Sequence, residues 1–227
     1  MLYFSQHIKK IKLVMRKNCL IIFFVTLLTS SSWAQLTLGG GLHSAAAFGD
    51  QVYPGMHLLG EYFQDNESSM YAKVGLTFSR NLADIQYTNL TPIDLTQPSG
   101  STGVTFNYTT IELGKRAYFS KDPEYGLALF GGTNMTLSFN RIALAEYDKT
   151  RYTATNAISG SVMGFALGLN GGIQNTSYFG TIYFDTGLSY ILMALPSNAV
   201  AGEILQSGAY KQLYFVFNVG FKRNLFL

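Results

Sequence analysis

Cysteine is almost missing from this chain: the one residue of this type, Cys19, lies in an apolar stretch near the N-terminus. A single cysteine excludes a disulfide framework, and a chain that loses this segment keeps no thiol for metal binding or nucleophilic catalysis. Charge is scarce as well, since Asp, Glu, Lys and Arg make up 13% of the residues, against about 25% in typical soluble domains. A chain so poor in charge must hide its apolar surface or place it in lipid.

Long hydrophobic runs are also missing after residue 34, where no stretch approaches the roughly 18 consecutive apolar residues of a membrane-spanning helix. Strands closed into a barrel are the other structure that satisfies every backbone hydrogen-bonding group in lipid. The sequence therefore argues against a helical bundle and favours a β-barrel.

The first 34 residues have the layout of a secretory signal peptide. Five basic residues precede a short apolar stretch, 19–28, and small residues come just before Gln35. This apolar stretch is about half of the roughly 20 residues that span a bilayer as a helix. An uncleaved anchor is the alternative. A lipoprotein is disfavoured, because the residues before Cys19 are not the small ones that a lipid-attachment site needs. We expect a signal peptide at 1–34 and the mature protein at 35–227.

Removal of this leader changes the electrostatics. The leader holds five of the 16 basic residues and none of the 13 acidic ones, so the mature chain has a net charge near −2. The basic pI of the precursor is thus no sign of nucleic-acid binding. We expect no nucleic-acid partner.

Apolar residues alternate with small or polar ones in segment after segment, the period of a half-buried strand. In the last such segment Leu213, Phe215, Phe217, Val219 and Phe221 share one face, which suits lipid, and the residues between them suit a narrow interior. This pattern predicts eight strands, near 36–48, 54–64, 70–83, 104–119, 125–139, 158–174, 178–193 and 209–223.

One segment breaks the pattern. In 104–119, Ile111 and Leu113 set the apolar face, yet Phe106 and Tyr108 fall on the other one. A bulge near Tyr108, or a strand tip beyond the membrane, would explain this.

The connections between the strands alternate in length. Short polar turns are expected at 65–69, 120–124 and 175–177, and longer loops near 84–103, 140–157 and 194–208, with a shorter one at 49–53. Short periplasmic turns, longer outer loops and an even number of strands are typical of bacterial outer-membrane barrels. The fold class predicted is all-β: an eight-stranded antiparallel up-and-down transmembrane barrel in the outer membrane, with both ends in the periplasm.

Aromatic residues flank each short turn, and rings of this kind favour the headgroup level of a membrane. We expect a periplasmic girdle made by Tyr62, Phe63, Tyr71, Tyr118, Phe119, Tyr125, Tyr178 and Phe179. A second ring on the loop side would come from Tyr53, Tyr87, Tyr147, Tyr152, Tyr190 and Tyr210.

Charged residues on the inward face form the candidate site. Glu61 and Lys73 are equidistant from the centre of the first short turn, so they are expected to face each other. Charges inside so narrow a barrel must pair, because an isolated buried ion is costly. The network predicted, with a structural or a gating role, contains Glu61, Lys73, Glu112, Arg116, Asp185 and Lys222.

The pattern as a whole resembles the small OmpA/OmpX-type barrels, and more narrowly it is similar to the PorT-like barrel proteins of Bacteroidota. The features that carry the resemblance are a leader that ends Trp-Ala-Gln, eight alternating strands and an apolar C-terminal strand. The resemblance implies a Gram-negative envelope, contact with outer-membrane lipid and lipopolysaccharide, and recognition of the C-terminal strand by the outer-membrane assembly machinery.

We therefore expect a non-catalytic outer-membrane protein with a structural, adhesion or secretion-complex role, whose outer loops contact an envelope protein; loop 84–103 is the best candidate. Alternatives are a narrow channel lined by the interior charges, a soluble lipocalin-like barrel and a lipid-modifying enzyme. The enzyme would rely on His57, inward and near the outer end, with Asp50 in the adjacent loop. His43 lies beside Ser44, but neighbours on a strand face opposite ways. No metal site or cofactor is expected.

Overall fold

The computed structural model describes residues 35–47, 52–94, 96, 98, 100–119, 125–144, 146–154, 159–206 and 212–225. The predicted signal peptide, residues 1–34, lies outside the described residues, as does Asp50. None of the described helices has the length and apolar character needed to cross a membrane.

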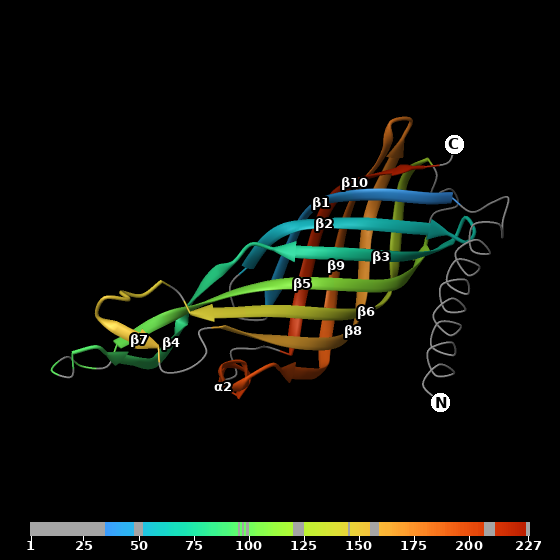
Figure 1. Ribbon diagram of the computed structural model, residues 1–227. Helices are drawn as coiled ribbons and strands as arrows, with labels where there is room; N and C mark the ends of the chain where they lie inside the picture. The colour runs from blue at the N-terminus through green and yellow to red at the C-terminus, as the bar shows by residue number, and fades with distance from the viewer. Residues whose placement is uncertain are drawn as a thin grey trace, which may run out of the picture. The chain divides into compact units, whose positions relative to one another are not determined.

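Of the ten strands in the described residues, eight close into an antiparallel ring through their pairings. Figure 1 shows how they are arranged. Each strand pairs with its predecessor, β10 pairs with β1, and a pairing of β3 with β5 completes the ring. The predicted all-β, eight-stranded up-and-down barrel is therefore confirmed. The barrel strands are β1 (Gln35–Ala47), β2 (Val52–Phe63), β3 (Ser68–Thr77), β5 (Gly100–Tyr118), β6 (Gly126–Leu144), β8 (Ser159–Ser177), β9 (Gly180–Pro196) and β10 (Leu213–Asn224).

The first hairpin turn fixes the register of β2 and β3. The amide of Gln64 donates to the carbonyl of Ser68 (3.0 Å), and Asp65 accepts from the amide of Glu67 at 2.8 Å. Because the turn closes here, Glu61 lies opposite Tyr71 and not opposite Lys73. The predicted facing of Glu61 and Lys73 is wrong: the turn is centred one residue earlier than expected, which moves every partner by two positions.

Strand β5 contains no bulge among its described residues. Its pairing with β6 runs without a break from Val104 to Tyr118. Phe106 and Tyr108 therefore keep their regular inward direction, and they are 3% and 8% exposed. Of the two explanations offered, the bulge near Tyr108 is therefore wrong, because the barrel interior at this level is apolar and accepts aromatic rings. That the tip of this strand extends beyond the membrane stays a prediction.

The long connections contain regular structure that the sequence analysis assigned to loops. β4 (Arg80–Pro92) continues the direction of β3 and pairs with β5, although its register shifts twice. β7 (Tyr152–Ala154) joins the edge of β4, and α2 (Ala199–Gln206) follows β9. We call the described residues of 80–103, together with 146–154, the tongue, since this sheet projects past the barrel in Figure 1.

The barrel interior has three layers. At the loop end, seven of the eight barrel strands and α2 supply an apolar layer that we call the loop-end plug: Ala45, Tyr53, Val104, Phe106, Tyr108, Ile142, Val162, Ala166, Ile191, Ala201, Tyr214 and Val216. At the opposite end, Tyr118, Ala128 and Phe130 pack together, with Phe63 against them; we call this the turn-end cluster. Ionisable side chains lie in the layer between.

Candidate functional site

The outer wall of the barrel is apolar. Side chains that alternate with buried ones along each strand are both large and exposed, among them Leu42 (68%), Leu58 (70%) and Leu169 (63%). In water such a band would be a severe aggregation hazard, whereas in a membrane it meets hydrocarbon. The molecule is a transmembrane β-barrel. The lipocalin-like alternative, which needs a polar outer face, does not fit this wall.

The six predicted charges all lie inside the barrel and form one connected network, which is the candidate functional site. Each is at most 4% exposed. They come from strands around the ring: β2, β3, β5, β9 and β10. Three are acidic and three are basic, so the network is neutral as a whole: Glu61, Lys73, Glu112, Arg116, Asp185 and Lys222.

Glu61 is the acceptor at the turn-end side of the network. Lys222 and Arg116 both pair with its carboxylate, the latter with 3.4 Å between Nη1 and Oε2. The hydroxyls of Ser69 and Tyr118 each donate to its Oε1 at 2.6 Å. A fully buried carboxylate is thus surrounded by two cations and two neutral donors, which offsets its loss of water.

Asp185 joins the two halves of the network. Its Oδ2 accepts from Arg116 Nη2 at 2.6 Å, and its Oδ1 is 3.5 Å from Lys73 Nζ. The amide of Asn218 also donates to Asp185. Since β3 and β9 lie on opposite sides of the ring, the Lys73–Asp185 contact crosses the lumen.

Lys73 and Glu112 end the network on neighbouring strands. Their register partners are each other, and Nζ lies 3.2 Å from Oε2. The Tyr71 hydroxyl donates to Glu112, and Asn134 Nδ2 donates to the same carboxylate at 3.0 Å. The sequence predicted both charged residues but not their two neutral donors, Tyr71 and Asn134.

Aromatic rings hold the central cation. The Arg116 guanidinium carbon lies 4.2 Å from the ring centroid of Tyr71 and 4.5 Å from that of Phe130. Stacking of this kind suits the flat, weakly hydrated guanidinium better than an ammonium group. Gly114 makes room for Tyr71, because a Cβ at this position would come within 2.6 Å of the Tyr71 ring.

The predicted periplasmic girdle is only partly right in its placement. Phe119, Tyr125, Tyr178 and Phe179 are 67–85% exposed, and Tyr62 is half-buried. Tyr71 and Tyr118, however, are buried inside the barrel as donors to the network, and Phe63 stacks on Tyr118 at 5.3 Å. These three were wrongly assigned to the girdle, because their strand positions share the inward face.

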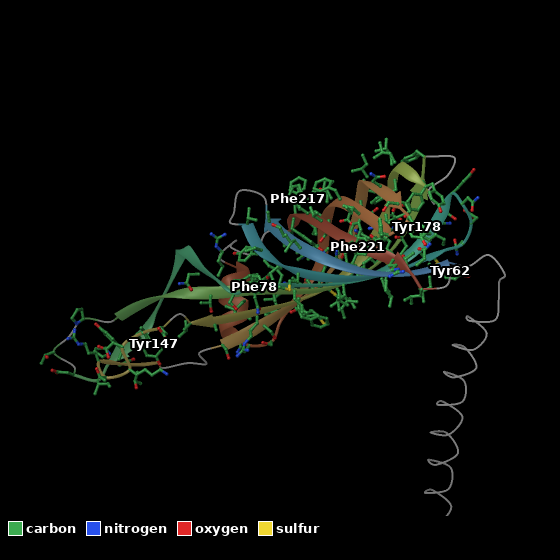
Figure 2. The ribbon with its side chains drawn as sticks, turned by 90° about the horizontal axis from the view of Figure 1, so that it is seen from above. Tyr62, Phe78, Tyr147, Tyr178, Phe217 and Phe221 are labelled. Atoms are coloured by element: carbon green, nitrogen blue, oxygen red, sulfur yellow. The ribbon has the colours of Figure 1, made fainter. Side chains whose placement is uncertain are left out.

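The second aromatic ring contains a similar error. Tyr53 is 1% exposed and belongs to the loop-end plug, while Tyr190 is 48% exposed as expected. Figure 2 shows Tyr147 on the tongue, at the opposite end of the molecule from Tyr62 and Tyr178. The side chain of Tyr87, and Tyr210, lie outside the described residues.

The two histidines face inward beneath the loop-end plug. His57 Nε2 contacts the Tyr183 hydroxyl, and its Nδ1 lies 3.1 Å from the carbonyl of Leu42. His43 Nδ1 lies 2.7 Å from Asn218 Oδ1. Neither ring is hydrogen-bonded to a serine or threonine hydroxyl in the described part of the chain, and no group of three potential metal ligands occurs there.

Comparisons with known proteins return structures of small bacterial barrels. Neisserial surface protein A is 10% identical, with a TM-score of 0.47 over 83% of this chain and 95% of that one. Ail, the attachment invasion locus protein of Yersinia pestis, is 12% identical with a TM-score of 0.40, over 84% and 97%. The N-terminal β-barrel domain of Pseudomonas aeruginosa OprF is 12% identical with a TM-score of 0.43, over 84% and 99%.

No protein-family model matches the chain, and no curated protein matches it in sequence. The narrower likeness to PorT-like barrels therefore stays a prediction.

Proposed function

We propose that this protein is a non-catalytic outer-membrane anchor, whose sealed barrel holds the tongue in place for a protein partner of the envelope or cell surface. One observation supports this proposal above all: the interior of the barrel is filled with paired charges, whereas the tongue projects past it. Every ionisable group of the network pairs with an opposite charge inside the barrel, so these residues hold strands together. Among the described residues, the tongue projects past the end of the barrel (Figure 1).

A sealed interior argues against the channel alternative. The charged layer lies between the loop-end plug and the turn-end cluster, and the buried apolar residues of both are at most 8% exposed. An ion entering from either end would lose its water against apolar side chains, at a cost of several kcal/mol. The interior charges therefore fit a structural role better than a gating one.

The tongue has the order expected of a binding surface. Leu90 is 2% exposed, Tyr152 packs on Gly100, and the amide of Ile93 donates to the carbonyl of Arg151 at 2.8 Å. A side-chain hydrogen bond from Thr150 to Asp148 closes the turn before β7. A sheet held in this way can present its outward residues, such as Thr91 and Thr153, in a fixed arrangement.

The enzyme alternative finds little support at the histidines. His57 needs a nucleophile within hydrogen-bond reach to act as its base. Its partners in the described structure are a tyrosine hydroxyl and a backbone carbonyl. These two contacts are those of an interior histidine whose ring nitrogens both have hydrogen-bonding partners.

Photo-crosslinking in living cells tests the proposed partner. A photoreactive residue at Thr91 or Thr153 should give a discrete crosslinked protein, whereas the same residue at Asn66, in a turn at the other end, should not give that product. Replacing residues 83–102 by a short glycine-serine turn should abolish the crosslink from Thr153 and reproduce the phenotype of a deletion strain. If the shortened variant folds and complements the deletion fully, the tongue is not the functional surface.

A further inference from the structure

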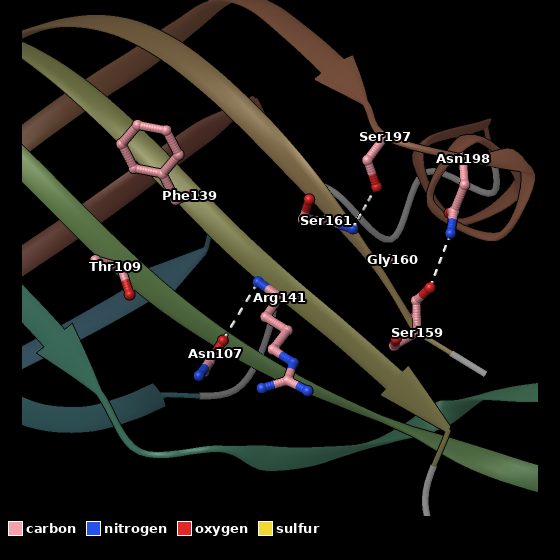
Figure 3. A pocket seen from close by; sticks show the side chains of 9 residues that line it. All are labelled: Asn107, Thr109, Phe139, Arg141, Ser159, Gly160, Ser161, Ser197 and Asn198. Atoms are coloured by element: carbon pink, nitrogen blue, oxygen red, sulfur yellow. Dashed lines mark hydrogen bonds between the residues drawn. The ribbon is translucent and has the colours of Figure 1, made fainter. Parts of the chain in front are cut away.

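The outer wall of the barrel has a hollow of about 500 Å³ at the loop end (Figure 3). The proposed function gives this hollow no role. Its volume lies within the roughly 300–1,000 Å³ of ordinary small-molecule sites. Outward residues of β5, β6 and β8 line it, together with two residues that follow β9: Asn107, Thr109, Phe139, Arg141, Ser159, Ser161, Ser197 and Asn198.

Strand register places a polar row across this hollow. Asn107 pairs with Arg141, and Arg141 pairs with Ser161. Ser161 and Ser197 exchange hydrogen bonds of 2.8 Å, in which each backbone amide is a donor. The side chain of Asn107 accepts from the amide of Arg141 at 3.3 Å, which holds these two residues of the row together, and the Arg141 side chain is exposed.

The adjacent row toward the membrane is apolar. Phe139 pairs with Met163, which pairs with Leu195, and the three are 40–47% exposed on the lipid-facing wall. The polar row therefore lies at the border of the apolar belt.

Arg141 supplies the charge of the site. Among the described residues it takes part in no salt bridge, although it is exposed. A second, smaller hollow of about 210 Å³ shares Arg141 and adds Lys149 and Glu146, which leaves the pair of hollows with a net positive charge. An arginine in such a setting recognises a phosphate through two parallel hydrogen bonds.

We propose that this hollow binds the phosphate-bearing headgroup of a membrane lipid, with Arg141 on the phosphate, the Asn107 side-chain amide and the serine hydroxyls on the headgroup's hydroxyls, and the acyl chains along Phe139 and Met163. The two adjacent rows carry the assignment. A soluble anion would use the polar row alone, and a neutral lipid the apolar row alone. A phosphorylated lipid satisfies both, and this assignment does not depend on the partner of the tongue.

Native mass spectrometry of the purified barrel in a neutral detergent tests the assignment. We expect diacylglycerol phosphate to be retained at least about ten-fold better than diacylglycerol, the gain of one charge-assisted hydrogen-bonded pair. Arg141→Gln should remove that preference and Arg141→Lys should keep part of it. Lys115→Gln is the matched control, since Lys115 is an exposed basic residue of the outer wall that does not line the hollow, and it should behave like the parent.

Three results would overturn the assignment. They are equal retention of the two lipids, equal loss in the Arg141→Gln and Lys115→Gln variants, and displacement of the bound lipid by millimolar inorganic phosphate. The last result would indicate a site for a free anion. A gel shift on heating verifies that each variant is folded, so a loss of lipid is not a loss of the barrel.

Discussion

Arg116 on β5 donates to Asp185 on β9 with 2.6 Å between Nη2 and Oδ2, so one ion pair ties together strands that are three places apart around the ring. The same guanidinium also pairs with Glu61 on β2. No backbone ladder connects these strands directly, and the interior charges therefore act as cross-braces of the barrel.

Removal of Arg116 should be strongly destabilising. Arg116→Met leaves two buried carboxylates short of a cation, a loss of about 3–5 kcal/mol in the free energy of unfolding. Urea titrations in detergent micelles, followed by circular dichroism, would measure it. The outward neighbour Lys115→Met should change stability by less than about 0.5 kcal/mol. Equal stability of the two variants would contradict the cross-brace.

Removal of both Arg116 and Asp185 should destabilise the barrel less than removal of Arg116 alone. Removing both charges leaves Glu61 with Lys222 and Glu112 with Lys73, so the interior remains neutral. The double variant Arg116→Met, Asp185→Leu should therefore be more stable than Arg116→Met alone, with a coupling of about 1–3 kcal/mol in a double-mutant cycle. Strictly additive losses would mean that the two residues act independently.

Gly114 should not tolerate even a methyl group. Gly114→Ala pushes a Cβ against the Tyr71 ring, which holds both Glu112 and Arg116, and should cost about 1–3 kcal/mol. Gly202→Ala is the matched control, because it adds a Cβ with nothing within 4 Å in helix α2, where alanine is favoured over glycine by about 1 kcal/mol. The same unfolding titration distinguishes them, and an unaffected Gly114→Ala would show that the Tyr71 ring is not fixed there.

The barrel should not conduct ions. Because tightly buried side chains fill the interior, with apolar clusters on both sides of the charged layer, the protein in planar bilayers should give no discrete current steps, and neither should Glu61→Gln or Lys73→Met. Steps in the parent that change in size or ion selectivity with these substitutions would instead support the channel.

The tongue should loosen in acid. Hydrogen bonds from the side chain and amide of Thr150 lower the pKa of Asp148 below its usual value. Its charged form is therefore favoured in the folded turn, and the stabilisation is present above a pH of about 4 and disappears as the pH falls through the lowered pKa. Hydrogen exchange of the Thr150 amide should rise over this range, after correction for its intrinsic pH dependence. Asp148→Asn accepts similar hydrogen bonds without titrating, so an unchanged acid transition in this variant would assign the effect elsewhere.

The alternation of apolar with small or polar residues was enough to predict both the apolar outer wall and the charged network inside the barrel. In β10 the exposed set Phe217, Val219 and Phe221 and the buried set Asn218 and Lys222 follow the expected faces. A period of two is a local property, fixed by the geometry of one strand, so a sequence reveals it directly.

The same rule would have corrected the aromatic assignments. Tyr71 shares its face with Lys73, and Tyr118 shares its face with Arg116, so both tyrosines had to point inward with the charges. Both tyrosines lie near a turn, but strand parity decides their direction, and inside the barrel their hydroxyls donate to the buried carboxylates of Glu112 and Glu61.

Register and non-local pairing could not be read in this way. The position of the first turn depends on how Asp65 caps it, and a shift of its centre by one residue replaced Lys73 with Tyr71 opposite Glu61. The tongue depends on β4 meeting β7, which lies some 60 residues further along the chain. Its Thr- and Pro-containing sequence has little strand signal by itself, so the sheet forms through pairing that only the folded chain provides.

The central claim is that residues 35–227 form a closed barrel with its apolar wall in a membrane. The most direct test is fractionation of cells that produce the protein, followed by electrophoresis of heated and unheated membrane samples. We expect the protein in the outer-membrane fraction, and we expect the unheated form to migrate faster, as a barrel that resists the detergent. Recovery of the mature protein in the soluble periplasm, with the same mobility before and after heating, would contradict it.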